Sequence, residues 1–409
     1  MQRRISVGVV DQIVSSGTSF VIGLAAAAVL SRDEFGLFAA GLAATAIVGS
    51  VGRGIVGDVA LTYLPSLQPA RAIQAAGTAI SCSIALGMLS ASVLFGLSLF
   101  PLKIFDGLAA FALCMPLLTF QDACRYIMIA RGDIGVALKS DGTWLLVQCL
   151  LITGIVAVGP INFYTVFGSW AAGLGVATIV ILIQAHGLFS ATNPLIWFRQ
   201  TRHFSGWFSS ATLLGQCQSQ LVVFVVGAFL SPAAVAGIRV IQLLILQPIQ
   251  TVLTALTSVL VPTLTRKLTA REYAQFSSLV SRLTRLGCAA GLVLVLLVPL
   301  GIFLITSLFP QYEEFNSLVP PVAIQAALLC VYISPVAALR AGRFGAPIFK
   351  AQLLGTLCTL GSVLLASIYG DANTVAWSLM GAYVVLAGSF VLAYRRSTFT
   401  SYVEESAGS

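Results

Sequence analysis

The length of its apolar blocks is what most constrains the fold of this chain. Of the 409 residues, 58% are hydrophobic and only 9% are Asp, Glu, Lys or Arg. A helix needs about 20 apolar residues to cross a bilayer, and about twelve such blocks follow one another here. They are too long and too uniformly apolar for β-barrel strands. We therefore predict an all-α, polytopic membrane protein, because helices satisfy their own backbone hydrogen bonds in lipid. The predicted spans lie near residues 6–29, 36–58, 76–99, 107–128, 142–159, 163–185, 206–229, 235–262, 286–308, 318–339, 349–369 and 373–394.

The cations fall at alternate gaps between these blocks. The loops after the even-numbered spans, together with the N-terminal segment, hold Arg3, Arg4, Arg71, Arg131, Lys139, Arg199, Arg202, Arg266, Lys267, Arg271, Arg340, Arg343, Lys350, Arg395 and Arg396. The opposite loops hold Arg32 and Lys103 and most of the loop acids. By the positive-inside rule both termini are predicted to be cytoplasmic. The formal charge of +8 thus reports membrane orientation, and no soluble basic domain for nucleic acid is expected.

The spans divide into two sets of six. We predict an N-terminal lobe over residues 1–189, a cytoplasmic linker over 190–204, a C-terminal lobe over 205–396 and a cytoplasmic tail over 397–409. A shift of 201 positions places Gly36 on Gly237 and aligns polar positions of the first and seventh spans, which favours an internal duplication. Two connectors, 195–204 and 266–286, are either amphipathic helices on the membrane surface or solvated linkers.

Polar side chains within the spans form stripes at helical spacing. The stripes contain Asp11, Ser15 and Thr18 in the first span, Ser209, Thr212, Gln216 and Gln220 in the seventh, and Arg239, Gln242, Gln250, Thr254 and Thr257 in the eighth. Such groups are costly against lipid, so they indicate either a water-accessible cavity or hydrogen bonds between helices.

Several charges lie near the cytoplasmic ends of spans. Arg53 can meet a phosphate, an acid on a neighbouring helix or the lipid headgroups, and Asp58 lies five residues after it. Asp122 and Arg125 share a helical face and can neutralise each other, and Asp141 begins the next span. These residues form either a structural charge network or a gate whose ion pairs break and reform.

The residue patterns of enzymes are missing from the sequence. It contains two histidines, His186 and His203, and no Ser/His/Asp set, metal-ligand spacing or Walker loop. The eight cysteines form no CxxC pair and lie mostly inside apolar spans. We expect neither enzymatic activity nor a cofactor or bound metal.

Three segments resemble the Wzx-like polysaccharide flippases of the multidrug/oligosaccharidyl-lipid/polysaccharide (MOP) superfamily. They are LSRDEFGLFAAG at the end of the first span, VPTLTRKL at the end of the eighth, and the region from Asp122 to Trp144. The resemblance implies a V-shaped bundle of two six-helix lobes in the bacterial inner membrane. It also implies that the protein moves an undecaprenyl-pyrophosphate-linked oligosaccharide outward by alternating access, among membrane lipids and beside a polysaccharide polymerase or glycosyltransferases.

That family builds a cationic cavity largely from the first, second, seventh and eighth spans. Under this resemblance Arg53 and Arg239 are expected to contact pyrophosphate or to gate, and Gln216, Gln220, Gln242 and Gln250 to face the glycan. Ser15 and Thr18 complete the expected cavity. Asp11, Asp58, Asp122, Arg125 and Asp141 form the expected gating network. The first and seventh spans hold no cation, unlike the family pattern. The alternatives are a multidrug or small-solute antiporter of the same superfamily and a non-transporting scaffold of a glycan-synthesis complex.

Overall fold

The computed structural model describes residues 17–184, 193–201, 207–342 and 344–397, and these residues are helical with no strand among them. The predicted all-α class is confirmed. Ten helices in this part are long and apolar enough to cross a membrane, and Gly17–Val29, Leu213–Phe229 and Val298–Leu308 are shorter apolar helices. The chain is therefore a multi-pass membrane protein. The count of twelve spans and the orientation of the termini stay predictions.

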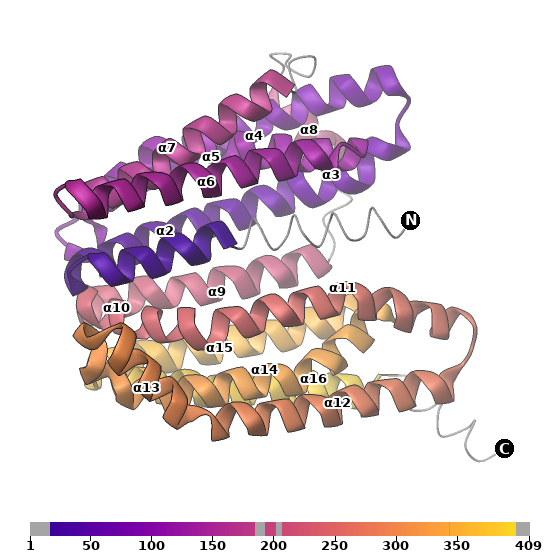
Figure 1. Ribbon diagram of the computed structural model, residues 1–409. Helices are drawn as coiled ribbons and strands as arrows, with labels where there is room; N and C mark the ends of the chain where they lie inside the picture. Colours follow the sequence, from indigo (N-terminus) through magenta and orange to yellow (C-terminus); the bar gives the residue numbers. More distant parts are fainter. Residues whose placement is uncertain (1–16, 185–192, 202–206, 343, 398–409) are drawn as a thin grey trace. The chain divides into compact units, whose positions relative to one another are not determined.

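The chain divides into two compact units. Unit 1 comprises Met1–Gly206 and Ser219–Ala236, and unit 2 comprises Trp207–Gln218 and Gly237–Ser409. The helices of each unit run side by side within it (Figure 1). The lobe boundaries expected from the sequence stay a prediction.

Unit 1 contains the helices that carry most of the buried charge. They are α2 (Arg32–Gly52), α3 (Asp58–Tyr63), α4 (Pro69–Ser98), α5 (Leu108–Arg131), α6 (Ile134–Val158), α7 (Phe163–Gln184) and α8 (Pro194–Thr201). A π-helical turn, Arg53–Gly57, joins α2 to α3. Helix α5 packs against α4, α7, α2 and α6, which places it at the centre of the unit.

Two helices have residues in both units, and the remaining helices belong to unit 2. The shared helices are α9 (Trp207–Phe229) and α10 (Pro232–Ile241). The others are α11 (Gln247–Thr269), α12 (Tyr273–Leu296), α13 (Val298–Leu308), α14 (Val319–Ala341), α15 (Gly345–Tyr369) and α16 (Ala372–Arg395). A second π turn, Gln242–Leu246, joins α10 to α11.

The region around the predicted ninth span differs from expectation. Residues 266–286 were expected to form a connector before a span at 286–308, but α11 continues to Thr269 and α12 begins at Tyr273. The polar first turns of α12 continue directly into its apolar part, so one helix covers both. Helix α12 ends at Leu296, and α13 begins at Val298 with Pro299, which supplies no backbone N–H, in its first turn.

The segment that resembles the flippases begins α2 with a capping box. The Ser31 side chain accepts a hydrogen bond from the Glu34 backbone N–H, and the Glu34 carboxylate accepts one from the Ser31 backbone N–H. Glu34 also accepts a hydrogen bond of 3.2 Å from the Phe163 backbone N–H at the start of α7. The acid therefore satisfies donors at the starts of two helices, which otherwise lack partners.

Small residues permit close helix contacts in both units. A Cβ at Gly36 would lie 2.8 Å from Cα of Pro232, and one at Gly237 would lie 2.5 Å from the ring of Phe315. The two glycines that align at an offset of 201 therefore both stand where a side chain would collide. The duplication itself stays a prediction.

An aspartate begins the last helix in the same manner as Ser31 begins α2. The carboxylate of Asp371 accepts hydrogen bonds from the backbone N–H and the hydroxyl of Thr374, each 2.8 Å long. These donors stabilise the ionised form and hold the pKa of Asp371 below its ordinary value. The cap satisfies one of the free N–H groups at the start of α16.

The α4–α5 seam shows how helices associate where lipid supplies no hydrophobic driving force. Gly87 lets the helices approach, and the Ser83 hydroxyl donates a hydrogen bond of 2.6 Å to the Thr119 carbonyl. A Cβ at Gly87 would lie 2.6 Å from Cα of Pro116 and 2.9 Å from the Met115 carbonyl oxygen. Both are backbone atoms, so the helices would have to separate.

We expect Gly87→Ala to destabilise the protein by about 1–3 kcal/mol through overpacking. The matched control is Gly96→Ala on the same helix, where a Cβ meets nothing within 4 Å. Thermal unfolding followed by fluorescence-detected size-exclusion chromatography should show a lower melting temperature for Gly87→Ala only. Equal melting temperatures for the two variants would contradict the role of Gly87.

Candidate functional site

Arg53 stands at the junction between α2 and the first π turn. Its Nε donates to the Gly49 carbonyl at 3.2 Å and its Nη2 donates to the Ser50 hydroxyl at 3.4 Å. The side chain is half-buried and interacts electrostatically with Asp58 and Asp122. π turns inside α-helices often occur at functional sites, and this one begins at a residue that the sequence analysis had selected.

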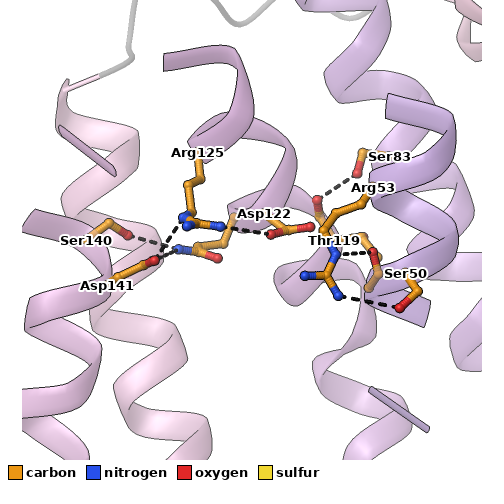
Figure 2. A network of polar contacts seen from close by, with 10 residues as sticks. Ser50, Arg53, Ser83, Thr119, Asp122, Arg125, Ser140 and Asp141 are labelled. Carbon is orange, nitrogen blue, oxygen red and sulfur yellow. Dashed lines mark hydrogen bonds and ion pairs between the residues drawn. The ribbon is translucent and has the colours of Figure 1, made fainter. Parts of the chain in front are cut away.

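A buried ion pair joins α5 to α6. Arg125 Nε lies 2.8 Å from Asp141 Oδ2, and the two side chains are 6% and 5% exposed. Arg125 Nη1 lies 3.9 Å from Asp122 Oδ1, and the Asp122 side chain is 22% exposed. Asp141 is thus the principal partner of Arg125, and Asp122 lies between the two arginines (Figure 2).

Neutral residues complete this network. Gln121 Nε2 donates to the Ser140 hydroxyl at 3.0 Å and to Asp141 Oδ1 at 3.1 Å, and the Ser140 hydroxyl donates to the Ala177 carbonyl of α7 at 3.0 Å. Sequence reasoning missed Gln121 and Ser140, although each adjoins a selected acid. The buried Asp141 carboxylate therefore receives a hydrogen bond as well as a counter-ion, which offsets the cost of burying its charge.

The five charged residues of this group do not make a cationic site. Three acids, Asp58, Asp122 and Asp141, face two bases, Arg53 and Arg125, so the formal balance is one negative charge. We name these five residues the charge network. Each acid has an arginine neighbour, and Asp122 lies near both arginines, so ion-pair partners can exchange within the network.

The glutamines of the seventh and eighth spans differ in exposure. Gln216 is exposed, whereas Gln220, Gln242 and Gln250 are half-buried. Gln242 is the first residue of the second π turn. None of these four is among the buried polar residues, so each keeps part of its side chain free of contact with other helices.

A fifth glutamine, which sequence reasoning did not select, lies in a buried contact between two helices. Gln218 is 4% exposed, and its Nε2 donates a hydrogen bond of 2.7 Å to the Thr359 hydroxyl. Its carbonyl oxygen accepts from Gln352 at 2.9 Å and from Thr356 at 2.8 Å, all on α15. The NH2 group and the carbonyl oxygen of Gln218 are thus both hydrogen-bonded, and this neutral cluster joins α9 to α15 within unit 2.

The other selected residues have mixed surroundings. Thr18 is 5% exposed, and its carbonyl accepts a hydrogen bond of 2.9 Å from the buried Gln148 of α6. Arg239 is half-buried on α10 and interacts electrostatically with Tyr383 of α16. Asp11 and Ser15 lie outside the described residues. Thr18 is therefore part of a packed helix contact, whereas Arg239 keeps exposed surface beside an aromatic hydroxyl.

Solved structures with known transport roles share this fold. A multidrug resistance MATE family transporter of the MOP superfamily, in an inward-facing conformation, matches with a TM-score of 0.72 and 13% identity over 96% of both chains. The lipid II flippase MurJ, in an inward closed conformation, matches with a TM-score of 0.74 and 12% identity over 96% of this chain and 88% of that one. The chain has the fold of MOP superfamily transporters.

A third match is a MOP superfamily transporter from Pyrococcus furiosus described as having a binding pocket of reversed polarity. Its TM-score is 0.61, with 14% identity over 98% of this chain and 95% of that one. No protein-family model matches the sequence, and no curated protein matches it. The predicted superfamily fold is confirmed by structure, while the narrower Wzx-like assignment stays a proposal.

We expect the removal of one partner of the Arg125–Asp141 pair to lower the stability of the protein strongly. Arg125→Met leaves Asp141 buried without its counter-ion and should cost about 3–5 kcal/mol, measured as a lower melting temperature in detergent. Asp122→Asn should cost less, because that carboxylate is farther from Arg125 and partly exposed. The double variant Arg125→Met with Asp141→Asn should recover part of the loss. A double variant less stable than Arg125→Met would contradict this assignment.

Proposed function

We propose that this protein is a flippase that moves an undecaprenyl-pyrophosphate-linked oligosaccharide from the cytoplasmic to the outer leaflet of a bacterial inner membrane by alternating access. The proposal keeps the predicted orientation, with both termini cytoplasmic, and the predicted division into two six-helix lobes in a V-shaped bundle. Support comes from the fold, which is shared with a lipid II flippase as well as with multidrug transporters.

The pairing of the acids is the observation that favours a lipid-linked substrate over a cationic drug. Asp141 is held by Arg125 at 2.8 Å and by Gln121 at 3.1 Å, and Asp122 lies near both Arg125 and Arg53. An incoming cation would have to compete with these arginines. Arginine, by contrast, suits pyrophosphate because its planar guanidinium donates two parallel hydrogen bonds.

In this proposal Arg53 and Arg239 contact the pyrophosphate at different stages of transport, while Gln216, Gln220, Gln242 and Gln250 offer donors and acceptors to sugar hydroxyls. Amide side chains suit this task because each carries both donors and acceptors without a charge to desolvate. The polyprenyl tail remains in the bilayer. Membrane lipids, and a polymerase or glycosyltransferases that use the same substrate, are the proposed partners.

A multidrug or small-solute antiporter is the second candidate. The charge network carries one more acid than base, and a net negative charge can attract a cation. Purified protein in liposomes distinguishes the two functions. A fluorescent lipid-linked oligosaccharide tested for leaflet accessibility reports the flippase, and ethidium exchange against an ion gradient reports the antiporter. Ethidium transport without oligosaccharide translocation would overturn the proposal.

We expect Arg53→Ala and Arg239→Ala each to slow oligosaccharide translocation about tenfold, which corresponds to about 1.4 kcal/mol. The matched control is Arg131→Ala, which removes an exposed cation at the end of α5. It should leave the rate within about twofold, because exposed charges contribute little. Rates equal to the wild type for both test variants, at equal protein levels, would remove these arginines from the site.

A further inference from the structure

Among the described residues, the largest fully buried side chain belongs to the short helix in the connector between the two predicted lobes. Trp197 of α8 is 0% exposed, and its indole Nε1 donates a hydrogen bond of 2.9 Å to the carbonyl of Ile55. The edge of its ring meets Tyr63, with the ring centres 5.9 Å apart and an angle of 77° between the planes. The connector is therefore anchored in the core of unit 1.

The acceptor of that hydrogen bond lies inside the first π turn. Ile55 is the third residue of Arg53–Gly57, two positions after Arg53. A π turn has one more residue than a regular turn of α-helix and is rare. We therefore expect contacts from neighbouring helices to stabilise it. The indole supplies such a contact on the backbone itself.

A second contact holds the opposite end of the turn. A Cβ at Gly57 would lie 3.0 Å from the ring of Tyr126, so α5 approaches the turn as closely as a glycine allows. Val56, between the two contacts, is 1% exposed and belongs to the same hydrophobic core as Trp197. The turn is thus held by α8 through Trp197 and by α5 through Tyr126.

We propose that Trp197 is a positioning residue for Arg53. By holding the Ile55 carbonyl, Trp197 fixes the π turn, whose first residue is Arg53. It thereby links the connector between the predicted lobes to the charge network. A movement of α8 is then transmitted to Arg53 through one hydrogen bond. The positioning of Arg53 by Trp197 does not depend on what the protein transports, whereas its consequence for transport rests on the proposed flippase function.

The outward face of α8 is exposed among the described residues. Leu195 and Phe198 are 59% and 56% exposed, and Arg199 is also exposed, while Trp197 and Thr201 are buried beneath them. Among the described residues, the helix packs mainly on α4. Its attachment to the π turn therefore depends on the inward face, where Trp197 is the large side chain.

The chain offers a matched pair of tryptophans for the test. Trp197→Phe keeps an aromatic ring and removes the N–H that Ile55 accepts. Trp144→Phe is the control, because Trp144 is also buried and its Nε1 has no hydrogen-bond partner among the described residues. Hydrogen–deuterium exchange of peptides covering residues 53–63 reports the turn directly in full-length protein in nanodiscs.

We expect Trp197→Phe to speed amide exchange across the turn about fivefold and Trp144→Phe to leave it unchanged. Unchanged exchange in Trp197→Phe would overturn the proposal. This readout does not require transport, so it remains decisive even if the protein proves not to move a lipid-linked oligosaccharide.

Translocation rates then test whether Trp197 acts through Arg53. Trp197→Phe should slow transport in the wild-type background and add nothing in an Arg53→Ala background, because residues acting through one group are not additive. If the two effects multiply, Trp197 acts independently of Arg53 and the positioning role is excluded. Melting temperatures of all variants identify any general loss of folding.

Discussion

The interior of unit 1 depends on the ion pair between Arg125 and Asp141. Burying two charges is costly unless they pair with each other, and here the pair lies 2.8 Å apart with a hydrogen bond from Gln121 to the same carboxylate. Because α5 carries Arg125 and also contacts α2, α4 and α7, the position of this one side chain affects the whole unit. Asp122 and Arg53 extend the network toward the first π turn.

Unit 2 joins a pair of its own helices in a different manner. Gln218 and three partners on α15 form a cluster without formal charge, in which both the NH2 group and the carbonyl oxygen of Gln218 are hydrogen-bonded. Such a cluster has no ion to exchange and no charge to neutralise, so it suits a permanent contact. The charge network differs, because Asp122 lies near two arginines and thus has alternative partners within reach. The two units therefore differ in chemistry although both are helical bundles.

Particular residues show how far the sequence could predict the site. Asp122 and Arg125 are three positions apart, so their proximity follows from helical geometry, and the structure pairs them at 3.9 Å. The stronger partner, Asp141, lies on another helix, and spacing along the chain could not rank it above Asp122. Gln218 was passed over and Thr18 was selected, yet both are buried in helix contacts. Helical periodicity gives the face on which a polar group lies, but it does not show which faces meet another helix.

The amino-acid sequence alone determined that this protein is helical and crosses a membrane many times, because lipid excludes unsatisfied backbone groups and the apolar blocks have the length of a bilayer. Only the tertiary structure decided which charges neutralise one another, where α2 and α10 give way to π turns, and that Trp197 reaches Ile55 across 142 positions of the chain. These features depend on contacts between helices far apart in sequence. Composition and periodicity carry no information on which helices become neighbours.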